Sequence, residues 1–195
     1  MSEEGLTKIL GEAREHYLAH YRAVVRRAKA DRPQAVPELL IELGSPVSSL
    51  VRRLARVDVI WGGAEKPSII EANVDLGATS ECLHSEPGPP ALRAFPLVWN
   101  ACEVLCSEPV DLESGFTEWF ERSLDPEDAR PPDEDGLAGV IHSATMPGSM
   151  GESWGFSVDL GSAPVEALIE LLGLPGFRRA RRIDIGSFTY GRQGE

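Results

Sequence analysis

Two apolar runs with polar residues at spaced positions constrain the fold of this chain most strongly. The runs are RVDVIW at residues 56–61 and PSIIEAN at residues 67–73, and a short stretch with two glycines separates them. Alternation with a period of two is typical of β-strands, and a glycine-containing loop between such runs predicts an antiparallel hairpin. A four-residue loop over residues 63–66 would set three cross-strand pairs, namely Ile60 with Ile69, Asp58 with Glu71, and Arg56 with Asn73.

The polar side chains of this hairpin would share one face, because successive side chains of a strand point to opposite sides. Asp58 and Glu71 then lie directly opposite each other, and two carboxylates in that position repel. A divalent cation removes this repulsion, and with the Asn73 amide the face offers three oxygen ligands, which suits Mg²⁺. Arg56 on the same face could hold a phosphate or carboxylate oxygen through bidentate hydrogen bonds. The alternative is an amphipathic hairpin whose polar face meets water.

The same residues carry a resemblance to a known family. RVD at residues 56–58, IIEAN at residues 69–73 and the loop VDLGATS at residues 74–80 resemble the metal-binding hairpin of ATP-grasp ligases. The likeness is greatest to D-alanine–D-alanine ligases. The resemblance implies a carboxylate–amine ligase that uses Mg²⁺ and ATP through an acyl phosphate, with a small-molecule or peptide carboxylate as substrate.

Each residue of the motif takes a role from this resemblance. Asp58, Glu71 and Asn73 would coordinate the magnesium ions that bridge the nucleotide phosphates. Arg56 would contact a phosphate or the acyl-phosphate intermediate, and Gly77 would offer a backbone N–H group to the substrate.

The pattern along the chain predicts an α/β fold in two parts. Residues 123–136 are acidic and rich in proline, which is typical of a linker between domains. Residues 1–122 would form a helical half that carries the hairpin, and residues 137–195 a partial Rossmann-like β-α-β unit. Helices are expected over residues 3–30, 45–57, 91–106 and 115–124 in the first part, and over 161–176 in the second. Strands are expected over residues 137–144, 152–160 and 181–188.

The order of these parts resembles the circularly permuted ATP-grasp proteins, in which the metal-bearing part precedes the Rossmann-like domain. In the family, lysines of a further lobe bind the adenine and phosphates, whereas this chain has only Lys8, Lys29 and Lys66. We therefore expect a fragment, a partner chain that supplies the nucleotide lobe, or a lost activity.

Charge and composition narrow the partners. The formal net charge of −12 argues against nucleic acid and against an anionic membrane. No apolar run is long enough to span a bilayer, and a cytoplasmic location is expected. A different class of function also fits the acidity, namely a non-catalytic interaction protein such as an immunity-type protein or an accessory subunit. His142 in the first strand after the linker is predicted to be structural, and Ser162 to cap the following helix.

Overall fold

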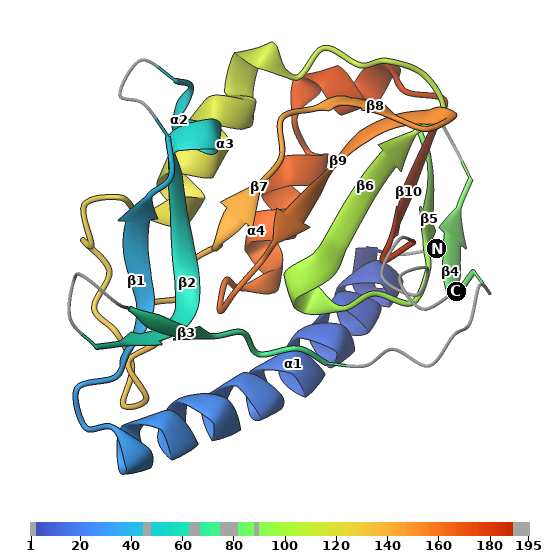
Figure 1. The fold of residues 1–195 in the computed structure, drawn as a ribbon. Helices are drawn as coiled ribbons and strands as arrows, with labels where there is room; N and C mark the ends of the chain where they lie inside the picture. Colours follow the sequence, from blue (N-terminus) through green and yellow to red (C-terminus); the bar gives the residue numbers. More distant parts are fainter. Residues whose placement is uncertain (1–2, 45–47, 63–66, 75–81, 88–89, 189–195) are drawn as a thin grey trace.

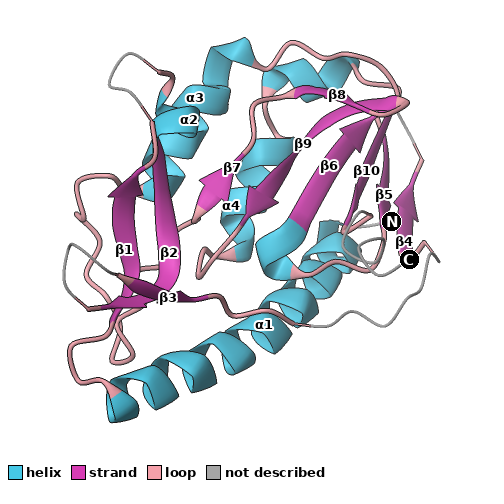
Figure 2. Ribbon diagram, viewed as in Figure 1, coloured by secondary structure: helices cyan, strands magenta, loops and turns pink. Residues whose placement is uncertain are grey.

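Two β-sheets and a set of helices make up the molecule, as the predicted α/β class requires (Figure 1). The computed structural model describes residues 3–44, 48–62, 67–74, 82–87 and 90–188. Both predicted parts of the chain contain helices and strands, and Figure 2 shows how these elements are arranged in space. No helix in these described ranges is both long and apolar enough to cross a lipid bilayer.

The elements follow one another in a mixed order. The helices are α1 (Glu3–Asp31), α2 (Leu50–Arg53), α3 (Glu113–Leu124) and α4 (Val165–Leu172), with 3-10 turns η1 (Trp99–Ala101) and η2 (Pro175–Arg179). The strands are β1 (Val36–Glu42), β2 (Leu54–Trp61), β3 (Ser68–Ile70), β4 (His84–Glu86), β5 (Ala91–Ala94), β6 (Cys102–Cys106), β7 (Ser143–Ala144), β8 (Gly148–Met150), β9 (Ser153–Asp159) and β10 (Arg182–Gly186).

The smaller sheet has three antiparallel strands in the order β1-β2-β3. In it Ile60 lies opposite Ile69, which is the pair expected from a four-residue loop. The pairing of β2 with β3 stops at Val59 and Ile70, however, and the chain leaves the ladder before Glu71. The hairpin is therefore shorter than the sequence pattern indicates, and Asp58 has no cross-strand partner on β3.

The larger sheet has seven strands, and it combines strands from both sides of the predicted linker. The central strand β6 pairs antiparallel with β9 on one side and with β10 on the other. Within the predicted second part, the described residues 137–188 therefore do not form a sheet of their own. The strands β9 and β10 flank α4 in the chain, but β6 lies between them in the sheet, which differs from the adjacent parallel strands of a Rossmann-like unit.

Residues 91–106 are predicted to be helical, and this prediction is wrong because the segment forms β5, η1 and β6. Cys102, Val104 and Cys106 are all buried on one face of β6. A spacing of four residues places two side chains on the same face of a helix and also on the same face of a strand, so the two cysteines could not distinguish the structures. The helix predicted over residues 45–57 is reduced to α2, because β2 begins at Leu54.

Residues 123–136, predicted to be a linker, pack closely against α1 and β2. The Asp135 carboxylate accepts hydrogen bonds from two nitrogens of Arg26, at 2.7 and 2.8 Å, and Arg22 forms an ion pair with Asp133 at 3.1 Å. The acidic residues of this segment thus neutralise basic residues of α1, and Arg56 of β2 also binds the segment.

Candidate metal centre

A buried histidine marks the junction of the two sheets. The backbone N–H of Arg56 on β2 donates to the carbonyl of His142 at 2.8 Å, and the His142 N–H donates to the carbonyl of Asp159 at the end of β9 at 2.9 Å. His142 is 1% exposed. These backbone hydrogen bonds hold the side chain of His142 between Asp58 of β2 and Asp159, the last residue of β9.

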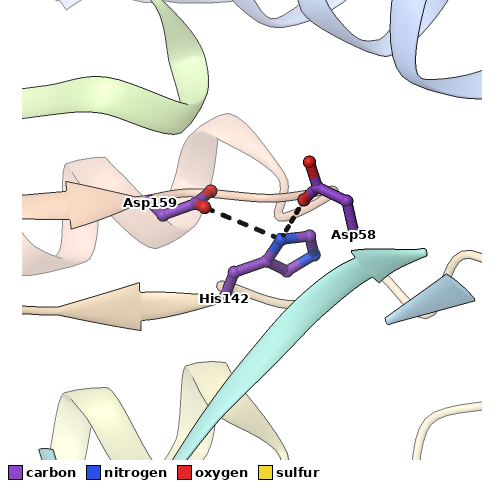
Figure 3. Close-up of side chains that lie close together, drawn as sticks. All are labelled: Asp58, His142 and Asp159. Atoms are coloured by element: carbon purple, nitrogen blue, oxygen red, sulfur yellow. Dashed lines mark ion pairs between the residues drawn. The ribbon is translucent and has the colours of Figure 1, made fainter. Parts of the chain in front are cut away.

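Three carboxyl groups surround the imidazole of His142. Nε2 lies 3.1 Å from Oε1 of Glu38 on β1, whereas Nδ1 lies 2.8 Å from Oδ1 of Asp58 and 3.8 Å from Oδ2 of Asp159. Figure 3 shows the two aspartates converging on Nδ1 from different elements. Nδ1 makes no hydrogen bond within the described part of the chain, so its short contact with Asp58 is an ion pair without good hydrogen-bond geometry.

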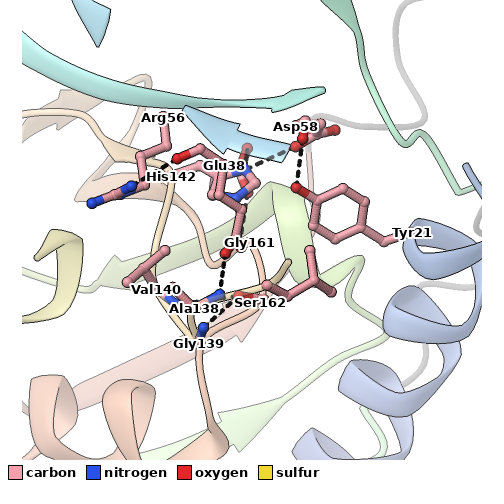
Figure 4. Close-up of polar contacts among 12 residues, drawn as sticks. Tyr21, Glu38, Arg56, Asp58, Ala138, Gly139, Val140, His142, Gly161 and Ser162 are labelled. Atoms are coloured by element: carbon pink, nitrogen blue, oxygen red, sulfur yellow. Dashed lines mark hydrogen bonds and ion pairs between the residues drawn. The ribbon is translucent and has the colours of Figure 1, made fainter. Parts of the chain in front are cut away.

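Asp58 is held firmly on the inner side of β2. Its side chain accepts a hydrogen bond from the backbone N–H of Ala72, and its carbonyl accepts one from the Tyr21 hydroxyl at 2.7 Å (Figure 4). The ring of Tyr21 also packs edge-on against the His142 imidazole, with the centroids 5.8 Å apart. These contacts leave Oδ1 of Asp58 directed at the histidine.

A glycine and a serine shape the other side of the cluster. Gly161 has a φ of +47°, and a Cβ at this position would overlap the imidazole of His142. The Ser162 hydroxyl accepts hydrogen bonds from the backbone N–H groups of Gly139 and Val140, at 2.9 and 3.2 Å. Ser162 therefore fixes the segment that leads into His142. It does not cap α4 as predicted, because the residue that precedes this helix is Pro164, which makes no capping side-chain hydrogen bond.

Burial and the neighbouring carboxyl groups shift the pKa of His142 and of Asp159. Burial alone lowers the pKa of His142, but the charge of Asp159, the short contact with Asp58, and the contact with and charge of Glu38 outweigh it and raise the pKa to about 10. Burial raises the pKa of Asp159 above its ordinary value, although a quarter of its side chain is exposed, at 25%. In the metal-free protein at neutral pH the imidazole therefore carries a proton.

The other residues predicted for the metal site lie elsewhere. Glu71 and Asn73 are exposed, whereas Asp58 is 5% exposed, so the three do not share one face as the hairpin argument expects. The strand geometry explains this, because the chain has already left β3 at Glu71. Gly77, the expected contact for the substrate, lies outside the described residues.

Arg56 is buried, and its guanidinium is fully engaged. Nε donates to the carbonyl of Leu124 at 2.8 Å, Nη1 to that of Glu38 at 2.7 Å, and Nη2 to the carbonyl of Asp125 and the carboxylate of Asp128. Five N–H groups in a fixed fork suit this set of acceptors. The arginine expected to bind phosphate thus joins β1 and β2 to the segment after α3.

The cluster has the spacing of a metal site. One donor atom from each of Asp58, His142 and Asp159 lies within 4.8 Å of the other two. Ligands at zinc distances of about 2.0–2.2 Å, in tetrahedral positions, lie ~3.3–3.6 Å from one another. The observed separations of 2.8 and 3.8 Å from Nδ1 bracket this value. The donor spacing is therefore compatible with one ion shared by the three residues.

Sequence reasoning identified Asp58 and missed the other members of the cluster. The signal available for His142 was its position in the apolar run GVIHSA, where a polar side chain requires a buried partner. Asp159 and Glu38 likewise end or interrupt apolar strands. Comparisons of this chain with protein-family models, with curated proteins and with solved structures found no match.

Proposed function

We propose that this protein binds one divalent transition-metal ion through Asp58, His142 and Asp159. The observation that supports the proposal most directly is the environment of the His142 ring. Glu38 occupies Nε2, whereas Nδ1 is buried, has no hydrogen bond among the described residues and faces two carboxylates. Buried acids that lie this close together require a compensating positive charge, and an ion bound between the three donors would supply it in place of the protonated ring.

The donor set favours zinc over magnesium. Imidazole nitrogen is a good ligand for zinc and for other late first-row metals, whereas Mg²⁺ prefers oxygen ligands alone. Two carboxylates and one histidine are three protein ligands, and catalytic zinc sites keep a further position for water. Asp159 is the least buried member of the triad, at 25% side-chain exposure, so water or a substrate would reach the ion from its side. Activation of a bound water for hydrolysis is the chemistry that such a site supports.

Zinc titration of the metal-free protein tests this proposal. We expect one zinc ion per chain, bound with release of a proton, because the imidazole is protonated in the metal-free state. Binding should be lost in His142→Gln and weakened at least tenfold in Asp159→Asn, whose partly exposed side chain makes misfolding less of a concern. Glu71→Ala is the matched control, because Glu71 is an exposed acid close to the cluster in sequence. Zinc binding that survives both substitutions in the triad contradicts the proposal.

The Mg-ATP-dependent carboxylate–amine ligase stays a prediction. It requires Glu71 and Asn73 to join Asp58 around Mg²⁺, and it requires a free Arg56 guanidinium for phosphate. The exposure of the first two side chains and the engagement of the third do not favour it. Calorimetric titration with MgATP, in the wild type and in Glu71→Ala, separates the hypotheses: heat that disappears in Glu71→Ala supports the ligase, and zinc binding without MgATP binding supports the triad.

The non-catalytic interaction protein also stays a prediction. The observation that favours it is the apolar exposure on and beside β1, where Val36, Leu39 and Leu43 are 44%, 41% and 64% exposed. β1 is an edge strand of the smaller sheet, and an edge strand with exposed apolar side chains can pair with another chain. Sedimentation velocity at increasing protein concentration, with Leu39→Ser as the variant, shows whether this strand contributes to self-association.

A further inference from the structure

We propose that Glu38 is the positioning residue of the metal site and dictates that His142 binds the ion through Nδ1. This inference rests on the proposed function, because it concerns how the histidine is presented to the ion. Glu38 does not approach the ion itself: its carboxyl group contacts the opposite side of the imidazole, at Nε2. Figure 4 shows Glu38 beside the His142 ring, with Asp58 on the other side.

Both carboxyl oxygens of Glu38 have defined partners. Oε1 lies 3.1 Å from Nε2 of His142, and Oε2 accepts a hydrogen bond from the backbone N–H of Ala138 at 2.6 Å. The carbonyl of Glu38 accepts a further hydrogen bond from Arg56 at 2.7 Å. With only 3% of the residue exposed, the carboxyl group has one orientation, and that orientation fixes the plane of the imidazole.

The backbone of β1 is distorted at Glu38 itself. Its φ is +52°, a left-handed value that residues other than glycine rarely adopt, and it lies in the middle of a strand. Val36, Pro37 and Leu39 all keep their partners on β2. The strain is therefore confined to the one residue whose carboxylate enters the cluster, and strained backbone of this kind concentrates at functional sites.

The consequence for ligand chemistry follows from the two nitrogens of the ring. A neutral imidazole has one N–H donor and one lone pair. With Asp58 bound to the ion, Glu38 is the carboxylate that remains to accept the ring proton, at Nε2. The lone pair of Nδ1 is then presented to Asp58, Asp159 and the ion between them. Carboxylates that hold a metal-binding histidine in this way typically contribute 10–100-fold to metal affinity.

Two substitutions at Glu38 test the inference against a control on the same strand. Glu38→Ala removes the acceptor and should weaken zinc binding 10–100-fold, the range found when such partners are replaced. In Glu38→Gln the amide oxygen can still accept from Nε2–H, whereas the amide NH2 faces the N–H of Ala138 and loses that hydrogen bond. This variant should therefore be less stable than the wild type but bind zinc more tightly than Glu38→Ala does. Glu42→Gln, an exposed acid later in β1, should bind zinc as the wild type does.

A spectroscopic measurement distinguishes positioning from a purely structural role. Long-range ¹H–¹⁵N correlation spectra of the zinc-loaded protein report which ring nitrogen of His142 carries the proton. We expect Nε2–H with Nδ1 bound to metal in the wild type and in Glu38→Gln, and a mixture or a change of nitrogen in Glu38→Ala. Unchanged zinc affinity and an unchanged ring signal in Glu38→Ala overturn the inference and leave the metal site standing. A wild type that binds no zinc overturns the proposed function first, and the inference with it.

Discussion

Glu38 on β1 and Asp58 on β2 lie opposite each other, and the imidazole of His142 lies between their carboxyl groups. The neighbouring pairs Pro37–Val59 and Leu39–Val57 set this register, and the two ring nitrogens contact the two acids at 3.1 and 2.8 Å. Facing carboxylates on neighbouring strands require a positive charge between them. The protonated histidine supplies that charge in the metal-free protein, and a bound ion would supply it otherwise.

Removal of this histidine should destabilise the metal-free protein strongly. His142→Ala leaves the carboxylates of Glu38, Asp58 and Asp159 close together without a cation, and the loss of one partner of a buried ion pair costs about 3–5 kcal/mol. Urea unfolding measures the change. The double variant with Asp58→Asn should recover part of the loss, because it removes one of the unpaired charges. If the unfolding free energy of His142→Ala lies within about 1 kcal/mol of the wild-type value, which is the effect of an ordinary substitution, this account of the cluster is wrong.

Stability of the metal-free protein should fall as the pH rises from neutral to alkaline. The folded state raises the pKa of His142 from 6.5 to about 10, so it binds the proton more tightly than the unfolded chain does. The stabilisation is fully present below pH ~6.5 and is lost as the pH rises through ~10. The urea midpoint in the presence of a chelator, measured from pH 6 to pH 10.5, reports this slope. His142→Gln should lack the slope between pH 6.5 and pH 9. Above pH 9 both proteins should lose stability, because burial raises the pKa of Cys102 and Cys106 from 9.0 to about 12. A wild type whose midpoint stays flat between pH 6.5 and pH 9 would show that the ring is neutral.

Several elements could be predicted from the sequence, and the cluster mostly could not. The amphipathic spacing of the first thirty residues, the aromatic stripe of α3 and the alternation of β9 and β10 are local patterns, and these elements exist as predicted. The partner of Asp58 was sought on β3, its neighbour in the chain. The actual partners, His142 and Asp159, lie 84 and 101 residues further along. The pairing of β7 with β9 and the backbone hydrogen bond from Arg56 to His142 bring them near Asp58. Single-sequence patterns carry no information about such contacts.

The acidic segment 123–136 illustrates the same limit. Proline and acidic residues are typical of solvated linkers, but here the acids meet arginines of α1 that lie over a hundred residues earlier. Composition does not reveal charge pairing between residues so far apart in the chain. It therefore predicts a linker where the structure has a segment of the folded body.

Arg56 should matter for stability rather than for nucleotide binding. In Arg56→Lys the shorter ammonium cannot reach four acceptors at once, and the carbonyls of Leu124, Glu38 and Asp125 lose their donors. Unsatisfied buried acceptors of this kind predict a loss of about 2–3 kcal/mol in unfolding free energy. Arg52→Lys, an exposed arginine four residues earlier, is the control and should change stability by less than about 0.5 kcal/mol. Equal effects of the two substitutions would show that the buried hydrogen bonds contribute little.

Loss of the hydroxyl group should affect stability differently at Tyr17 and at Tyr21. The Tyr17 hydroxyl is buried and has no hydrogen-bond partner among the residues that the structure describes, whereas that of Tyr21 donates to the carbonyl of Asp58. Tyr17→Phe should therefore leave stability unchanged or raise it by up to about 1 kcal/mol, and Tyr21→Phe should lower it by about 1 kcal/mol. Thermal unfolding of the metal-free protein compares them. If Tyr17→Phe is the more harmful of the two, the hydroxyl has a partner in solution.

Substitution of Gly161 should lower both the stability of the protein and its affinity for zinc. Its φ of +47° and the imidazole next to it exclude a side chain, because a Cβ would overlap the ring atoms of His142. Gly161→Ala should therefore cost about 2–4 kcal/mol and reduce zinc affinity, since the ring must move away from Asp58. Gly139→Ala separates the two causes: its φ is +70° but nothing lies within 4 Å of the added Cβ, so only the backbone cost of about 1 kcal/mol remains. Equal losses in the two variants would mean that backbone strain accounts for the whole effect and that contact with His142 adds nothing.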